Sequence, residues 1–292
     1  MKHFFMLIAL CYAINLPAQP PKPADRILYG RITTDSLTKP PYDTWFTKNY
    51  NDYTINPTAQ QQLQPTLLKG ITIKAFFGSW CGDSKRELPR LIKVLDGIGF
   101  NKKSLEIVAT GGSDSLYKQS PAGDEKGLGI FKVPVFIVYK DGRETGRINE
   151  FPVETLERDL LAILTGSGYT PNYKSFATLN KWLNTGVLSD TNTTVRGLSM
   201  QIKNLIDNEY ELNSLGFLLL KHKQPKEALT VFKINAALFP NSANVLSSLG
   251  EAYLTSGEKE KAIVILEKSL ELNPTPVLIK SILELLYKAK GL

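Results

Sequence analysis

The strongest chemical signal in the sequence is one cysteine at the point where a strand-like apolar run gives way to a helical pattern. Cys81 lies in the run Trp-Cys-Gly-Asp-Ser at positions 80–84, shortly after Phe76 and Phe77. A cysteine in the first turn of a helix is close to unpaired backbone N–H groups and to the positive end of the helix dipole, which stabilise its thiolate. We therefore predict a nucleophilic thiol at Cys81, with an inert, packed cysteine as the alternative.

Ser84 occupies the position at which a second cysteine would complete a Cys-x-x-Cys dithiol motif. Its hydroxyl can donate a hydrogen bond to the Cys81 thiolate, but a hydroxyl is far too basic to attack a mixed disulfide. Lys85 and Arg86 would add positive charge near the thiol, whereas Asp83 works against it. The sequence therefore predicts a thiol that forms mixed disulfides but lacks an internal partner to resolve them.

The first 18 residues have the pattern of a secretory signal peptide. Lys2 supplies the charged start, residues 4–10 form an apolar run, and Ala18 offers a small residue for cleavage. Cleavage after Ala13, an uncleaved membrane anchor and lipidation at Cys11 are the alternatives. No later stretch approaches the roughly 18 apolar residues of a membrane-spanning helix. We expect a periplasmic or secreted protein with no stable membrane insertion after cleavage.

Removal of residues 1–18 would leave Cys81 and His222 as the only cysteine and the only histidine. Such a chain cannot form an internal disulfide or a zinc site of cysteine and histidine ligands, and we expect no metal and no other cofactor. A solvated surface position is expected for His222, between Lys221 and Lys223. The net charge of +7, from 35 Lys and Arg against 28 Asp and Glu, is spread along the chain. This indicates a solvated basic surface and no nucleic-acid partner.

Residues 57–165 alternate between strand and helix patterns. The predicted elements are a short helix at 59–64, a strand at 71–77, a helix at 81–95, strands at 105–109, 133–139 and 144–148, and a closing helix at 153–164. Asp141-Gly142 marks a hairpin turn between the last two strands. Such alternation implies a parallel sheet flanked by helices. Before it, residues 19–56 form a proline-rich extension that we predict to be irregular, because it lacks sustained periodicity.

The C-terminal part contains an internal repeat with a period of 34 residues. Leu212, Leu215, Gly216, Leu219, Ala228, Phe232 and Pro240 recur as Leu246, Leu249, Gly250, Tyr253, Ala262, Leu266 and Pro274. This pattern resembles the tetratricopeptide repeat, in which two antiparallel helices pack with a small residue at their crossing. We therefore predict linker and capping helices in 166–208, and repeats with a final capping helix in 209–292.

Residues from about 57 to 165 resemble a thioredoxin-fold domain. Three spacings carry the resemblance: Trp80-Cys81-Gly82, Pro89 eight residues after Cys81, and Val133-Pro134 with Gly142 eight residues beyond Pro134. In that family the equivalent proline is cis and lies against the nucleophilic sulfur, and the preceding residue presents its backbone to a bound polypeptide. The resemblance implies a thioredoxin-like α/β sandwich followed by an all-α tetratricopeptide-type domain.

The same resemblance suggests the site residues. It implies catalytic roles for Cys81, Ser84 and Pro134, and substrate binding by Trp80, Gly82, Asp83 and Val133. Two residues depart from the family pattern: Ala75 replaces the acid that often lies six residues before the nucleophile, and Asn149-Glu150 replaces the glycine expected beyond the hairpin. Without the resolving cysteine and the acid, we expect no efficient dithiol reductase turnover. Binding and mixed-disulfide chemistry remain open.

Two functions from different classes fit this sequence. The first is an exported thiol–disulfide exchange protein that acts through Cys81 on cysteine-containing clients or a redox partner, with the repeats binding a protein ligand. The second is a non-catalytic adaptor or chaperone, similar to known thioredoxin–tetratricopeptide fusions. The run Cys-Gly-Asp-Ser also resembles the Cys-Gly-Phe-Ser of monothiol glutaredoxins, but Trp80 before the cysteine and the Gly111-Gly112 pair before Pro134 argue against that family.

Overall fold

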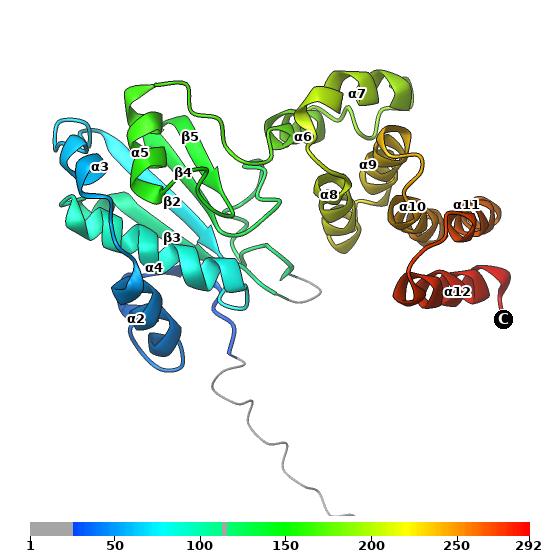
Figure 1. The fold of residues 1–292 in the computed structure, drawn as a ribbon, viewed down its shortest axis with the longest axis horizontal. Coiled ribbons are helices and arrows are strands. Elements are labelled where there is room, and N and C mark those ends of the chain that lie inside the picture. The colour runs from blue at the N-terminus through cyan, green and yellow to red at the C-terminus, as the bar shows by residue number, and fades with distance from the viewer. Residues whose placement is uncertain (1–25, 113–115) are drawn as a thin grey trace, which may run out of the picture.

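The computed structural model describes residues 26–112 and 116–292, so the predicted signal peptide and Cys11 lie outside the described residues. Figure 1 shows an N-terminal part built on a five-stranded mixed sheet with helices, and a C-terminal part made of helices. The predicted order of an α/β region followed by an all-helical region is therefore confirmed. No helix within the described ranges is both long and apolar enough to cross a membrane.

The sheet has the strand order β1-β3-β2-β4-β5. Its strands are β1 (Gly30–Ile32), β2 (Ile71–Phe77), β3 (Leu105–Ala109), β4 (Val135–Lys140) and β5 (Arg143–Asn149). Only β2 and β3 pair in parallel, so the prediction of a parallel sheet is wrong for the β2–β4 pair. The antiparallel β4–β5 pair is the predicted hairpin, and β1, which was not predicted, pairs antiparallel with β3. β4 and β5 form a tight hairpin, in which Asp141 and Gly142 have φ angles of 51° and 79°. This is the conformation that an Asp-Gly pair favours in a two-residue turn.

The two faces of the sheet are covered by different kinds of structure. Ala75 and Phe77 of β2 belong to an apolar core shared with α4 (Gly82–Gly97) and α5 (Leu156–Thr165). Phe76 points to the opposite face, because side chains alternate along a strand. It packs there with Val133 and other apolar residues of an irregular segment before β4. We call residues 116–134 the cover segment.

Helix α4 carries the candidate cysteine at its start. Cys81 is the N-cap residue, with extended φ and ψ of −89° and 129°. Apolar residues then recur at helical spacing, and the following side chains are buried against the sheet: Leu88, Leu91, Ile92, Val94 and Leu95. The helix lies on the core face of the sheet in Figure 1, so packing along its whole length fixes the position of its first turn.

The N-terminal extension is more ordered than the sequence predicts. It contains β1, α1 (Thr34–Leu37) and α2 (Asp43–Asp52), and α3 (Pro57–Gln62) follows it. The prediction of irregular structure for residues 19–56 is wrong where these elements lie. Helix α2 has one buried residue, Phe46, and packs against α4. Because tertiary contact and not an amphipathic stripe holds α2, its sequence lacks the periodicity that predicts a helix.

The C-terminal helices are α6 (Ser175–Asn184), α7 (Val195–Ile202), α8 (Glu209–Lys221), α9 (Pro225–Leu238), α10 (Ala243–Thr255), α11 (Lys259–Glu271) and α12 (Pro276–Lys290). In this part, α8 packs against α9 and α10 packs against α11. The two repeat glycines lie at the closest approaches: a Cβ on Gly216 would be 2.5 Å from a ring atom of Phe232, and one on Gly250 would be 2.5 Å from Leu266. The predicted role of small residues at the α8–α9 and α10–α11 crossings is confirmed.

The cover segment also joins the two parts of the molecule. Phe131 packs edge-on against Phe176 of α6, with ring centroids 5.1 Å apart. The side-chain amides of Asn180 and Asn184 both donate hydrogen bonds to the carbonyl of Gly127. The segment therefore has the sheet on one side and the first of the C-terminal helices on the other.

Candidate functional site

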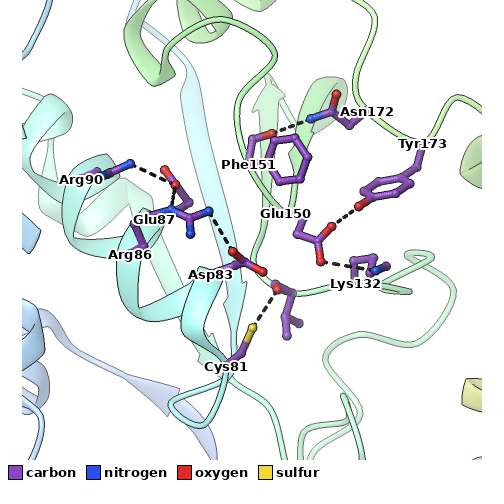
Figure 2. A network of polar contacts seen from close by, with 11 residues as sticks. Cys81, Asp83, Arg86, Glu87, Arg90, Lys132, Glu150, Phe151, Asn172 and Tyr173 are labelled. Atoms are coloured by element: carbon purple, nitrogen blue, oxygen red, sulfur yellow. Dashed lines mark hydrogen bonds and ion pairs between the residues drawn. The ribbon is translucent and has the colours of Figure 1, made fainter. Parts of the chain in front are cut away.

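The Cys81 sulfur lies at the start of α4, beside the backbone that leads into β4. Its Sγ is 3.3 Å from the carbonyl oxygen of Val133, to which the thiol donates a hydrogen bond (Figure 2). The Val133–Pro134 peptide bond is cis, and Val133 itself is buried. The side chain of Cys81 is half-buried, and Cys81 is the one cysteine within the described residues. The structure thus brings Cys81 beside Val133 and Pro134, which lie 52 and 53 positions later in the sequence.

Trp80 and Gly82 flank the thiol in different ways. The Trp80 indole donates a hydrogen bond to the carbonyl of Thr110 at 3.0 Å, and its ring lies 5.5 Å from that of Tyr117. A Cβ on Gly112 would be 2.6 Å from the same indole, so the ring is held in a tight pocket. A Cβ on Gly82 would meet no atom within 4 Å. The residue before Cys81 is therefore held firmly by its neighbours, whereas the residue after it borders open space.

Ser84 is turned toward the protein interior. Its side chain is fully buried, and its Oγ accepts a hydrogen bond from the backbone N–H of Gly78 at 3.0 Å. Within the described residues no hydrogen bond joins Ser84 to the Cys81 sulfur, which differs from the predicted donation to the thiolate. The hydroxyl instead ties the first turn of α4 to the end of β2, because this turn leaves the Gly78 N–H without a strand partner.

Asp83 and Arg86 pair with each other and not with the thiol. Arg86 lies 2.8 Å from Asp83 and 2.6 Å from the buried Glu87, which also pairs with Arg90 at 3.2 Å (Figure 2). The carboxylates hold the pKa of Arg86 above its ordinary value, chiefly through the Glu87 hydrogen bond. That Arg86 adds positive charge at Cys81 stays a prediction, and the two carboxylates beside Arg86 act against it.

Glu150 is a site residue that the sequence prediction missed. It follows β5 with a φ of 63°, and its N–H donates to the carbonyl of Pro134 at 2.7 Å. Its carboxylate is 3.4 Å from Lys132 Nζ and accepts a hydrogen bond from the Tyr173 hydroxyl (Figure 2). Burial, followed by the Glu150 hydrogen bond, raises the pKa of Tyr173. The only sequence signal was that Asn149-Glu150 departs from the expected glycine.

Lys118 and Tyr117 of the cover segment were also missed. Lys118 is 7% exposed and its Nζ donates to the carbonyl of Phe131 at 2.9 Å. Tyr117 bridges two regions, because its ring lies beside Trp80 and its carbonyl oxygen is 2.8 Å from Nε2 of His222 on the helical side. The prediction that His222 is a solvated surface residue is therefore wrong. No spacing or periodicity marks these residues, since the segment has no regular structure.

Comparison with protein-family models and with curated proteins finds no match to this chain. The residues that the structure describes contain no group of three or more histidine, cysteine or carboxylate side chains arranged to hold a metal ion. The chemistry of the site must then be argued from its own groups. These are a half-buried thiol at a helix N-terminus, the Val133 carbonyl against the sulfur, and a buried lysine whose ammonium contacts the Phe131 carbonyl two residues before Val133. Such a thiol can act as a nucleophile toward another sulfur.

Proposed function

We propose that the protein is a thioredoxin-like thiol–disulfide exchange protein that acts through Cys81. One observation carries this proposal: the Cys81 sulfur lies at the N-terminus of α4, 3.3 Å from the carbonyl that precedes the cis residue Pro134. The helix N-terminus favours the thiolate. Cys81 is half-buried and the adjacent Gly82 is exposed, so a bound polypeptide could reach this turn. The thioredoxin-like assignment rests on these contacts together with the sequence spacings.

The proposed reaction is a single exchange. The Cys81 thiolate attacks one sulfur of a client disulfide, a new bond forms between Cys81 and that sulfur, and the client's own disulfide bond breaks. The second client sulfur leaves with the electron pair as a thiolate, which then takes a proton from solvent. The mixed disulfide persists until an external thiol attacks it, because Ser84 cannot supply a second thiolate. Clients are therefore held covalently until a low-molecular-weight thiol or a partner protein releases them.

The helical pairs α8–α9 and α10–α11 are proposed to be tetratricopeptide-type repeats that bind a protein ligand or the clients themselves. The 34-residue period and the glycine contacts at both crossings support this assignment. Export to the periplasm or to the outside of the cell is proposed from the N-terminal pattern. An oxidising compartment would supply the disulfide-bonded clients on which such a protein acts.

The test is a trapping assay on the full chain carrying Cys11→Ser, so that Cys81 is the only thiol. Incubation with glutathione disulfide should give a stable adduct at Cys81 by intact mass spectrometry, and addition of dithiothreitol should release it. With dithiothreitol as the reductant, Ser84→Cys should enable the protein to reduce the disulfides of insulin, at a rate limited by the missing acid at Ala75. Cys81→Ser is the matched control and should form no adduct.

One outcome would contradict this function. An unreactive Cys81, combined with undiminished binding of an unfolded client by Cys81→Ser, would favour the non-catalytic adaptor.

A further inference from the structure

Lys118 lies in the wall of the Cys81 site. Its ammonium donates to the carbonyl of Phe131, two residues before Val133, and lies 5.0 Å from the ring centroid of Tyr117. The Tyr117 ring packs in turn against Trp80, which precedes Cys81. Two short chains of contacts therefore link this buried cation to the sulfur, one through Phe131 and Val133 and one through Tyr117 and Trp80.

Several charged and titratable groups face Lys118. Burial lowers the pKa of Lys118 to about 8; Lys132 lowers it further, while Glu150 and the charge of Cys81 act in the opposite direction. The same thiol acts on Tyr117, because burial and then the charge of Cys81 raise the pKa of Tyr117.

Other charged and polar groups approach from the helical side and from the same cavity. Lys221 lies over the Tyr117 ring, and His222 contacts the Tyr117 carbonyl. Glu125, which accepts hydrogen bonds from Ser120, lines the same cavity as Lys118. The ammonium of Lys118 thus contacts the Phe131 carbonyl and the Tyr117 ring directly, and the charges of Lys132, Glu150 and Cys81 act on it from farther away.

The local backbone gives no reason for a lysine at this position. Lys118 has a φ of 55°, in the left-handed region that glycine, asparagine and aspartate enter most readily. Its backbone N–H already donates to the carbonyl of Gly111. A buried ammonium also loses its hydration, and lysines are rarely found this deeply buried. Both costs fall on this one residue, which suggests that the charge itself has a role.

We propose that Lys118 is a positioning residue for the thiol chemistry, whose buried ammonium stabilises the thiolate of Cys81. This rests on the proposed exchange reaction. The ammonium acts twice in that reaction: on the free thiolate before it attacks a client, and again on release. When an external thiolate attacks the client sulfur of the mixed disulfide, the bond to Cys81 breaks and the Cys81 sulfur leaves with the electron pair. The cation therefore stabilises the Cys81 thiolate both before it attacks a client and when it leaves the mixed disulfide.

The proposal sets a pH window. Lys118 is a cation below its pKa of about 8 and neutral above it. The stabilisation of the thiolate is therefore present at neutral pH and is lost as the pH rises through about 8. Coupling between two titrating groups is reciprocal, so loss of the thiolate must also change the titration of Lys118.

The first experiment measures the rate of Cys81 alkylation by iodoacetamide from pH 5 to pH 10 in the Cys11→Ser chain. Lys118→Met should slow alkylation at pH 7 by about three- to tenfold and move the midpoint of the profile upward by roughly half to one pH unit. Lys118→Arg keeps a charge that does not titrate and should react faster than Lys118→Met. The exposed Lys126 of the same segment provides the matched control, and Lys126→Met should leave the profile unchanged. A folded Lys118→Met variant whose profile coincides with that of the parent would overturn the proposal.

A second experiment needs no substitution at Lys118 beyond the one used for assignment. The ¹³Cε resonance of Lys118, assigned by its absence in Lys118→Arg, is titrated before and after Cys81 is blocked with iodoacetamide. The titration midpoint should fall on blocking, since the thiolate that favours the ammonium is gone. An unchanged midpoint would overturn the proposal even if Lys118→Met does not fold. Failure of the exchange function is a separate result: the parent chain would then form no mixed disulfide with glutathione disulfide.

Discussion

The two faces of the sheet are built for different tasks. On the core face, α4 and α5 bury regularly spaced aliphatic side chains against β2 and its neighbours. On the other face the irregular cover segment supplies Tyr117, Lys118, Val133 and Pro134, all of them around the sulfur of Cys81 or in contact with its neighbours. The regular face positions the helix that carries the thiol, and the irregular face provides its chemical surroundings. Substitutions on the two faces should therefore separate stability from reactivity.

The largest effect is expected on the core face. Leu91 of α4 is fully buried in the apolar core, so Leu91→Ala should leave a cavity and lower the free energy of unfolding by about 2–5 kcal/mol. Urea denaturation measures this loss. Under native conditions the alkylation rate of Cys81 should stay at the parent value, because Leu91 belongs to the opposite face. A change in the pH profile of alkylation would contradict the division between faces.

The next largest loss of stability is expected at the helix crossings of the C-terminal part. Gly216→Leu and Gly250→Leu would each force a side chain against Phe232 or Leu266, and should cost about 1–3 kcal/mol through overpacking. Thermal unfolding would show the loss, and Gly82→Leu offers a control at a position with open space. If both repeat substitutions left the melting temperature unchanged, the close crossings at these glycines would be wrong.

A smaller loss of stability, coupled to a change in reactivity, is expected on the irregular face. Gly112→Ala would place a Cβ 2.6 Å from the Trp80 indole and should displace the ring, at a cost of about 1 kcal/mol. Because Trp80 adjoins Cys81, the alkylation rate should also change. Gly82→Ala, which adds the same methyl group in open space, should change stability by much less. An unaltered alkylation rate in a destabilised Gly112→Ala variant would show that the indole does not influence the thiol.

The sequence predicts the regular face far better than the irregular one, and the reason is physical. Helix α4 and its strands have local periodicity, and the repeat glycines are marked by their spacing of 34 residues. Cys81 could be placed at a helix N-terminus from its neighbours alone. Lys118 and Glu150 could not be found, because their roles depend on contacts between distant segments: Lys118 with Phe131, and Glu150 with Tyr173. Helix α2 was missed for the same reason, since packing against α4 holds it.

The smallest effect concerns the edge where the cover segment meets β1. Arg31 of β1 donates two hydrogen bonds to the Asp124 carboxylate, at 3.0 and 2.7 Å, and its Nε lies 3.1 Å from Glu106. The Arg31 hydrogen bond is the main reason that the pKa of Asp124 lies below its ordinary value of 3.8. A carboxyl whose pKa is lowered by folding stabilises the native state above its unfolded pKa, and that contribution is lost as the pH falls through the lower, folded pKa.

Asp124→Asn should therefore lower the urea midpoint slightly at pH 7, and the difference from the parent chain should shrink as the pH falls below about 4. The effect is expected to be small because the Arg31 side chain is 65% exposed, so solvent weakens the ion pair although the Asp124 side chain is buried. A double-mutant cycle with Arg31→Ala isolates the pair from the other contacts of each residue. A coupling that is the same at pH 7 and pH 3 would mean that the ion pair does not hold the cover segment to the sheet. The cover segment would then be held to the sheet only by its apolar contacts and by its contacts with the C-terminal helices.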